Sequence, residues 1–248
     1  MTAILTANPD GAYEVEGQTI TMPVRVGHAR QAAATFLVPR GPVERLLEPT
    51  RLKPAKQGGK RAMVSLALVD YLENDLGTYK ELALAILVDD PAGSPPKAKG
   101  SVSTYIHRLP VSEEFTCAAG KGIWGFPKWV ADLDVHFHEH SVHCQLNDAE
   151  GHMVLSVEML RGPLPIPRRP LPMVAYTCDD EGVVRRTPWD TNGTGSQRIR
   201  PGGTRIEIGY GHPIADELRS LGLTRRPLMT MWDDHMSATF GSPEVVDI

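Results

Sequence analysis

Cysteine is scarce in this sequence. Three cysteines occur among 248 residues, and no two of them form a C-x-x-C pair: Cys117, Cys144 and Cys178. An odd number of widely spaced cysteines supports neither a disulfide framework nor a cysteine-based zinc site. We therefore expect these residues to be small hydrophobic side chains of the interior.

The sequence also lacks an excess of either charge and any long apolar run. Lysine and arginine number 26 against 30 acids, and no half of the chain is basic, which disfavours a nucleic-acid partner. Nowhere do about eighteen apolar residues run together, as a membrane helix would need. The first residues have neither the basic region nor the apolar core of a signal peptide. We expect a cytoplasmic protein that binds neither nucleic acid nor membrane.

Several well-known site motifs are absent too. There is no G-x-G-x-x-G after a strand, no P-loop and no G-x-S-x-G elbow, so dinucleotide, P-loop and serine-hydrolase chemistry have no support. Histidine, by contrast, is concentrated in the stretch "VHFHEHSVHC", where it alternates with apolar residues. That alternation predicts a hairpin of two strands whose histidines lie on the solvent-exposed face. We therefore expect no metal site at its four histidines, His136, His138, His140 and His143.

Glycine and proline are plentiful and divide the chain into short segments, which favours strands over long helices. We expect a β-rich α+β protein, one domain over residues 1–248, whose sheet closes or stacks to hide its edges. Helices are expected at 41–48, 112–123 and 212–223, the second begun by Ser112 before two acids. Strands are expected at 18–26, 61–72, 79–90, 101–109, 129–138, 141–146, 152–160, 169–178, 204–210 and 226–240.

One lysine has an unusual setting. In "GIWGFPKW", Lys128 follows a proline and lies between two large aromatic residues, Phe126 and Trp129. Pro127 fixes its own backbone angle and restricts Phe126 before it, the aromatic rings can form a low-dielectric wall, and no acid lies within three residues of the lysine. Burial disfavours the charged form of an amine, and a neutral amine is a nucleophile. An exposed strand-entry lysine is the alternative reading of Lys128.

The stretch "GKGIWGFPKWVADLDV" resembles the lysine signature of the acetoacetate decarboxylase superfamily, and "LGTYKE" is similar to its glutamate motif. The resemblance runs from about Tyr13 to Val246. It implies a cone-shaped closed β-barrel with a few flanking helices, a homo-oligomer, and no metal or organic cofactor. It also implies that Lys128 forms a Schiff base with a small keto acid and that Glu81 is an active-site acid. Tyr79, two residues before Glu81, would share its strand face and could be a second donor.

The sequence departs from the family pattern at several places. Trp129 stands where the decarboxylases have a second lysine, so burial alone would have to keep the Lys128 amine neutral. The family's N-terminal arginine falls near Gln18, and its strand glutamate falls near Ser65 or Leu66. Arg25 is an alternative cation for a substrate carboxylate, inferred from this sequence and not carried over from the family.

Three functions remain open at this point. An imine on Lys128 is an electron sink, with Glu81 as proton shuttle, and it could serve decarboxylation of a β-keto acid of the acetoacetate type. The same imine could serve aldolase-dehydratase chemistry on pyruvate or a related keto acid. The third possibility is a non-catalytic ligand-binding protein on the same scaffold.

Overall fold

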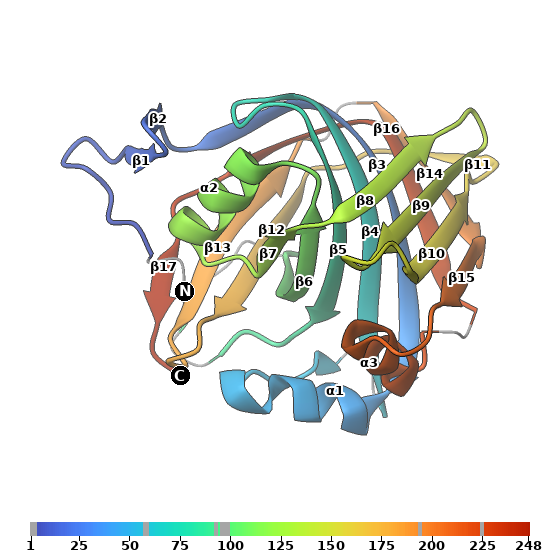
Figure 1. Cartoon of the computed structure of the whole chain (residues 1–248). Helices are drawn as coiled ribbons and strands as arrows, with labels where there is room; N and C mark the ends of the chain where they lie inside the picture. Colours follow the sequence, from blue (N-terminus) through green and yellow to red (C-terminus); the bar gives the residue numbers. More distant parts are fainter. Residues whose placement is uncertain (1–3, 57–59, 92–93, 95–99, 193–194, 224–225) are drawn as a thin grey trace.

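Strands form most of the protein, which we describe from a computed structural model (Figure 1). The structure describes residues 4–56, 60–91, 94, 100–192, 195–223 and 226–248. A short hairpin of β1 (Tyr13–Val15) and β2 (Gln18–Ile20) precedes two larger sheets. No helix in these described residues has the length and apolar character needed to span a membrane.

The larger sheet closes on itself. Going round, β16 pairs with β3, β3 with β4, β4 with β5, β5 with β6, β6 with β12, β12 with β13, and β13 again with β16. The prediction of a β-rich α+β protein with a closed sheet is confirmed, and this ring of seven strands is compatible with a barrel. Its strands are β3 (Val24–Pro39), β4 (Arg61–Asn74), β5 (Tyr79–Leu87), β6 (Val102–Val111), β12 (Leu171–Cys178), β13 (Val184–Thr191) and β16 (Met229–Phe240).

Four shorter strands extend the ring. They are β7 (Lys128–Val130), which pairs in parallel with β6, and β11 (Leu164–Pro167), β14 (Ser196–Pro201) and β17 (Glu244–Val246). The second sheet has the order β15-β10-β9-β8 and is fully antiparallel. Its strands are β8 (Asp132–Phe137), β9 (Ser141–Asn147), β10 (Met153–Leu160) and β15 (Thr204–Ile208). The histidine tract forms the β8–β9 hairpin with its four histidines exposed, as predicted.

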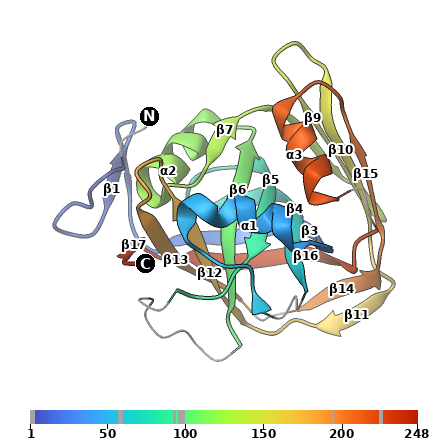
Figure 2. The ribbon, with the colours of Figure 1, turned by 90° about the horizontal axis from the view of Figure 1, so that it is seen from below.

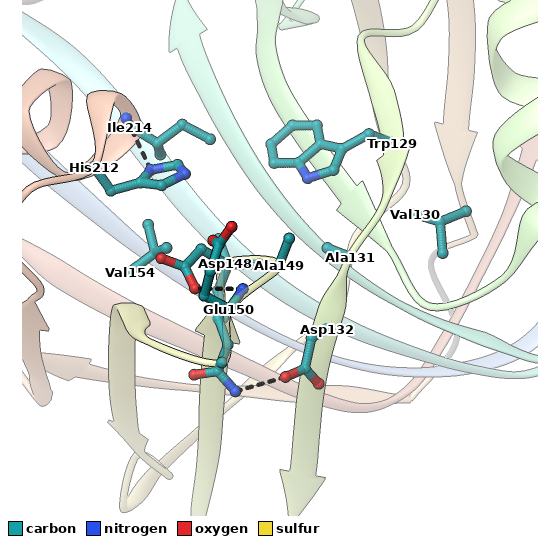
Figure 3. A pocket seen from close by; sticks show the side chains of 13 residues that line it. Trp129, Val130, Ala131, Asp132, Asp148, Ala149, Glu150, Val154, His212 and Ile214 are labelled. Carbon is teal, nitrogen blue, oxygen red and sulfur yellow. Dashed lines mark hydrogen bonds between the residues drawn. The ribbon is translucent and has the colours of Figure 1, made fainter.

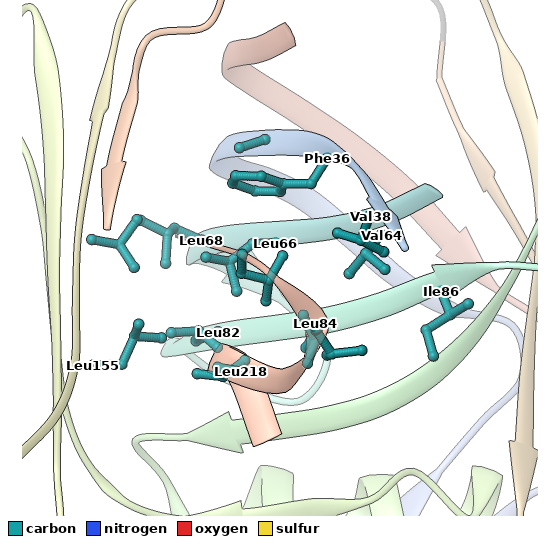
Figure 4. Packing of buried hydrophobic residues seen from close by; sticks show 14 of the residues in the cluster. Phe36, Val38, Val64, Leu66, Leu68, Leu82, Leu84, Ile86, Leu155 and Leu218 are labelled. Atoms are coloured by element: carbon teal, nitrogen blue, oxygen red, sulfur yellow. The ribbon is translucent and has the colours of Figure 1, made fainter. Parts of the chain in front are cut away.

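The second sheet packs against the outside of the ring. Figure 4 shows this core, in which leucines of β4 and β5 such as Leu66 and Leu82 meet Leu155 of β10 and Leu218 of the helix α3 (Pro213–Leu221). Because successive residues of a strand point to opposite faces, the neighbours of these leucines point into the ring. Glu81, next to Leu82, is among the residues directed inward.

Three α-helices are found in the described part, close to the predicted positions: α1 (Arg40–Leu47), α2 (Glu114–Trp124) and α3 (Pro213–Leu221). Helix α1 lies at the lower end of the ring in Figure 1 and in front of it in Figure 2. Ser112 does not cap α2, whose N-cap is Glu113. Instead the Ser112 hydroxyl accepts a hydrogen bond from the Lys80 N–H at 2.9 Å, which ties the start of α2 to β5.

Candidate active site

Lys128 and Glu81 form an ion pair inside the ring. Lys128 Nζ lies 3.0 Å from Glu81 Oε2, and the two side chains are only 4% and 9% exposed. The sequence showed no acid near Lys128 along the chain, yet Glu81 is adjacent to it in space. Burial is therefore not the only feature that can give a neutral amine, because a carboxylate within hydrogen-bond distance can accept its proton.

Strand register brings the pair together. Glu81 of β5 is opposite Val111 of β6, and Lys128 of β7 pairs with Leu109 of the same β6 strand. Leu109 and Val111 are two residues apart and share a face, so Lys128 and Glu81 both point into the ring from either side of β6. The pairing links two sequence motifs that are far apart in the chain.

Helix α2 delivers Lys128 to this position. Gly125 ends the helix in the left-handed region, with φ of 67°, and its N–H donates to the Lys121 carbonyl. Phe126 N–H donates to the Gly120 carbonyl at 3.0 Å, which completes a tight helix stop. Pro127 then directs the chain into β7. The sequence G-F-P-K therefore has a local structural purpose: it turns a helix directly into a strand that begins with the lysine.

Two tyrosines accompany the ion pair. Tyr71 of β4 donates from its hydroxyl to Glu81 Oε1 at 3.3 Å, and Lys128 Nζ donates to the Tyr79 hydroxyl at 3.4 Å. Their rings stack with centroids 4.3 Å apart, and Lys128 Nζ lies 4.7 Å from the Tyr79 centroid. Burial raises the pKa of both tyrosines well above the ordinary value, and the nearby Glu81 charge adds to this rise. Both phenols therefore stay protonated and remain available as donors.

The aromatic residues beside Lys128 occupy other places. Phe126 is buried and stacks on Trp124, with centroids 5.7 Å apart, in a hydrophobic cluster that includes Leu109. Trp129 is next to Lys128 on β7 and therefore points to the opposite face. There its indole lines a hollow of about 520 Å³ together with His212 and Asp132 (Figure 3). The expectation that Trp129 walls the lysine therefore does not match its placement.

Arg25 also lies away from the pair. Its side chain is exposed, between Val24 and Val26, which are buried, so it points out of the ring. Its backbone N–H donates to Asp75 Oδ2 at 2.8 Å. The structure therefore brings together Lys128, Glu81 and Tyr79 of the residues selected from sequence, and separates Arg25 from them.

Residues that lie directly opposite one another on adjacent strands form a layer across the ring. The layer that contains Glu81 holds other polar side chains that the sequence did not single out. Glu81 is opposite Val69, Val69 is opposite Gln31, and Gln31 is opposite Asp233 of β16. Asp233 is buried in an ion pair with Arg168. A local pattern could not have revealed this layer, because it depends on the register of strands distant in sequence.

A different group offers ligand atoms for a metal ion. Among the described residues, Asp148, Glu150 and His152 have potential ligand atoms within 4.8 Å of one another at the β9–β10 turn. Glu150 and His152 are exposed, and Asp148 already accepts hydrogen bonds from the backbone N–H groups of both. This group is therefore the ordinary arrangement of a polar turn and lies on the outer surface, apart from the Lys128 pair.

The comparison with family models shows which protein family the chain is related to. The model of the acetoacetate decarboxylase family matches residues 15–246, a span that includes both Glu81 and Lys128. The chain belongs to the acetoacetate decarboxylase family. Curated protein sequences give no match.

Three solved structures share the fold at low sequence identity. Acetoacetate decarboxylase from Legionella pneumophila superposes with a TM-score of 0.66 at 14% identity, over 92% of this chain and 88% of that one. The enduracididine biosynthesis enzyme MppR in complex with pyruvate gives 0.65 at 11% identity, over 100% and 99%. An acetoacetate decarboxylase-like enzyme from Sphingomonas wittichii RW1 gives 0.59 at 13% identity, over the full length of both. These likenesses show an acetoacetate decarboxylase fold.

The geometry of this acetoacetate decarboxylase family member suits nucleophilic and proton-transfer chemistry. An amine with a carboxylate at 3.0 Å can lose its proton to that neighbour without a net change of charge in the buried pair. The carboxylic acid formed can then return the proton to another atom at the same place. Of the two neutral phenols beside them, Tyr71 donates a hydrogen bond to the carboxylate and Tyr79 accepts one from the amine.

Proposed function

We propose that the chain is a carbon–carbon lyase that forms a Schiff base between Lys128 and a small keto acid. The observation that carries the proposal is the Lys128–Glu81 pair, 3.0 Å apart and buried within the ring, whose two sequence motifs resemble those of the family. A buried lysine with a proton acceptor at hand is the arrangement that an amine nucleophile needs.

Imine formation uses both members of the pair. Glu81 takes the proton from the Lys128 ammonium, and the free amine attacks the ketone carbon to form a carbinolamine. Glu81, now a carboxylic acid, gives its proton to the departing hydroxyl, which leaves as water. The product is an iminium ion, and its positive nitrogen draws electrons from the adjacent carbon.

Decarboxylation of a β-keto acid is the first outcome that this iminium supports. The bond to the carboxylate breaks, carbon dioxide leaves, and the electron pair forms an enamine with the nitrogen. Glu81, reprotonated from solvent, protonates the enamine carbon. Water then hydrolyses the new iminium, which releases the ketone and returns Lys128 to its starting state.

Aldolase-dehydratase chemistry on pyruvate is the second candidate, and structural comparison favours it. MppR, which this chain resembles along nearly its whole length, has been solved with pyruvate and with the condensation product of pyruvate and imidazole 4-carboxaldehyde. On that route Glu81 removes a methyl proton from the pyruvate iminium, and the resulting enamine attacks an aldehyde. The Trp129 departure from the decarboxylase signature is compatible with such divergence.

Borohydride trapping tests the shared step. The protein is incubated separately with acetoacetate, pyruvate and acetopyruvate, reduced, and mapped by mass spectrometry. We expect an adduct on Lys128 that the Lys128→Ala variant lacks. An absence of adduct with every compound would contradict the proposal and favour the ligand-binding alternative.

Two further readouts separate the outcomes. Carbon dioxide release from acetoacetate identifies a decarboxylase, whereas deuterium exchange into the pyruvate methyl group identifies enamine formation for an aldol reaction. The Glu81→Gln variant should lose about 10²- to 10⁴-fold in either turnover, because its amide cannot carry the proton. If Glu81→Gln turned over substrate at the native rate, Glu81 would not be the proton shuttle.

A further inference from the structure

Two neighbouring acids on β16 form ion pairs on opposite sides of the ring wall. Asp233 pairs with Arg168, and Asp234 pairs with Arg161. Asp234 and Arg161 line a hollow on the outer surface, where Trp232 Nε1 also donates to Asp234 at 2.8 Å. Because successive strand residues alternate, Asp233 points the other way, into the ring.

The inner ion pair, Asp233 with Arg168, lies in the same layer of the ring as Glu81. The register runs from Asp233 to Gln31, from Gln31 to Val69 and from Val69 to Glu81, each pair directly opposite across adjacent strands. Three strand spacings correspond to about 14 Å along the wall. In a closed ring of seven strands this places Asp233 and its arginine on the side facing Glu81, with the interior between them.

Arg168 has a hydrogen-bond donor left over. Its Nη2 bonds Asp233 and its Nη1 donates to the His235 carbonyl at 2.7 Å, but its buried Nε has no partner among the described residues. The side chain is only 5% exposed, whereas that of Arg161, whose Nε is also unpartnered, is 26% exposed. A buried guanidinium donor without a partner is costly, and a carboxylate is the acceptor that its fork geometry fits.

We propose that Arg168 is the substrate-binding cation of this enzyme and holds the carboxylate of the keto acid whose carbonyl reacts with Lys128. This inference rests on the proposed Schiff-base function. Asp233 serves as a counter-ion that orients the guanidinium before substrate arrives. The sequence pointed to Arg25 for this task, but that side chain faces outward.

The two candidate reactions make different demands on such a cation. In decarboxylation the negative charge leaves the carboxylate as carbon dioxide forms, so an arginine that binds it helps the ground state and not the transition state. In aldol chemistry the carboxylate is retained, and the arginine binds it throughout. Loss of Arg168 should therefore raise KM for both reactions, and should leave kcat level for the aldol route but level or higher for decarboxylation.

The test compares keto acids with their uncharged methyl esters. Full-length protein is titrated with pyruvate or methyl pyruvate, and with acetoacetate or methyl acetoacetate, and the concentration for half-maximal borohydride trapping on Lys128 is measured. Native protein should trap the acids at lower concentration than the esters. Arg168→Met should reduce this preference at least tenfold and leave ester trapping within twofold.

Two further variants serve as controls. Arg161→Met removes the arginine that pairs with Asp234 on the outer side of β16. It should leave the preference for acids over esters unchanged. The double variant Arg168→Met/Asp233→Asn avoids an unpaired buried carboxylate and should behave as Arg168→Met does. Circular dichroism and thermal unfolding confirm that each variant is folded.

The possible failures are distinguishable. If Arg168→Met and the double variant keep the native preference for acids, or lose acid and ester trapping together, the Arg168 proposal is overturned. If native protein forms no adduct with any of the four compounds, the Schiff-base function fails instead. Calorimetric titration with pyruvate then decides the matter: binding by native protein that Arg168→Met lacks supports carboxylate binding, and no binding by native protein overturns it.

Discussion

The backbone of Gly120 lies directly against the side chain of Lys128. A Cβ placed on Gly120 would stand 2.5 Å from Lys128 Cδ and 2.7 Å from Cε, closer than real side chains approach. The glycine therefore leaves the space through which the lysine reaches Glu81. Because Gly120 is an ordinary residue of α2 without a positive φ, this contact is the reason that a larger residue would not fit.

The variant Gly120→Ala should disable Lys128 without harming the fold. The added methyl must displace the lysine stem, so we expect borohydride trapping to fall at least tenfold. Alanine is the better helix former by about 1 kcal/mol, so the free energy of unfolding should stay level or rise. Gly122→Ala is the matched control, because its methyl meets Leu5 instead and should leave trapping intact. Unchanged trapping in Gly120→Ala would refute this account of the contact.

The Tyr71 hydroxyl should matter for turnover. It donates to Glu81 Oε1 at 3.3 Å, and hydrogen bonds to charged groups contribute about 1.5–3 kcal/mol. Tyr71→Phe should therefore lower kcat about tenfold in whichever reaction the protein catalyses. Tyr176→Phe is the control, since its hydroxyl bonds Asp90 elsewhere. Equal rates for Tyr71→Phe and native protein would show that this bond contributes nothing to the reaction.

Restoring the second lysine of the family signature should have little effect on the first. Trp129 faces the outer hollow, so a lysine there would place its charge on the other side of β7 from Lys128. We expect Trp129→Lys to change the rate of adduct formation, and its dependence on pH, by less than about twofold, on the order of 0.4 kcal/mol. A clear shift of the trapping profile to lower pH would indicate that the two positions communicate through the strand.

Glu217 should make the fold sensitive to acid. Burial acts to raise its pKa, but hydrogen bonds from His107 and Arg108 of β6 prevail and hold that pKa at about 2, below its ordinary value of 4.5. The folded pKa is depressed, so the stabilisation is present above pH 4.5 and is lost as the pH falls towards 2.

Denaturation with urea measures this contribution. Glu217→Gln should lower the free energy of unfolding at pH 7 by roughly 1–3 kcal/mol and flatten its decline between pH 4.5 and 2. The adjacent Asp216→Asn, whose side chain is 69% exposed, should change little. A Glu217→Gln curve parallel to that of native protein would mean that the ion pair does not link α3 to the ring.

Much of the fold could be read from the sequence, and the exceptions have physical causes. The three helices and most strands follow from turn residues and apolar runs. The sequence pattern predicts strand β3 only as far as Val26, and the stretch "GHARQAAATFL" that follows is rich in alanine, a helix former. Tertiary pairing overrides that preference: β3 is held between β16 and β4, where alanines such as Ala32 and Ala34 are fully buried.

The site was predictable only in part. Lys128 and Glu81 each lie in a recognisable local motif, and the structure places them together. Trp129 is expected beside the Lys128 amine because the two residues are adjacent in sequence, but both lie on β7, where successive side chains point to opposite faces. Tyr71 and Arg168 had no local signal, because their positions depend on strand register and on a segment that returns to the ring between β11 and β12.

The order of strands round the ring also bears on how the protein is made. Strand β16 follows every other ring strand in the sequence, yet it is the one that joins β3, the first, to β13. During synthesis the walls around Lys128 and Glu81 can therefore be complete only after β16 has left the ribosome. Contacts so distant in sequence make for slow folding. A nascent chain would carry Lys128 in an open sheet until the last ring strand closes it.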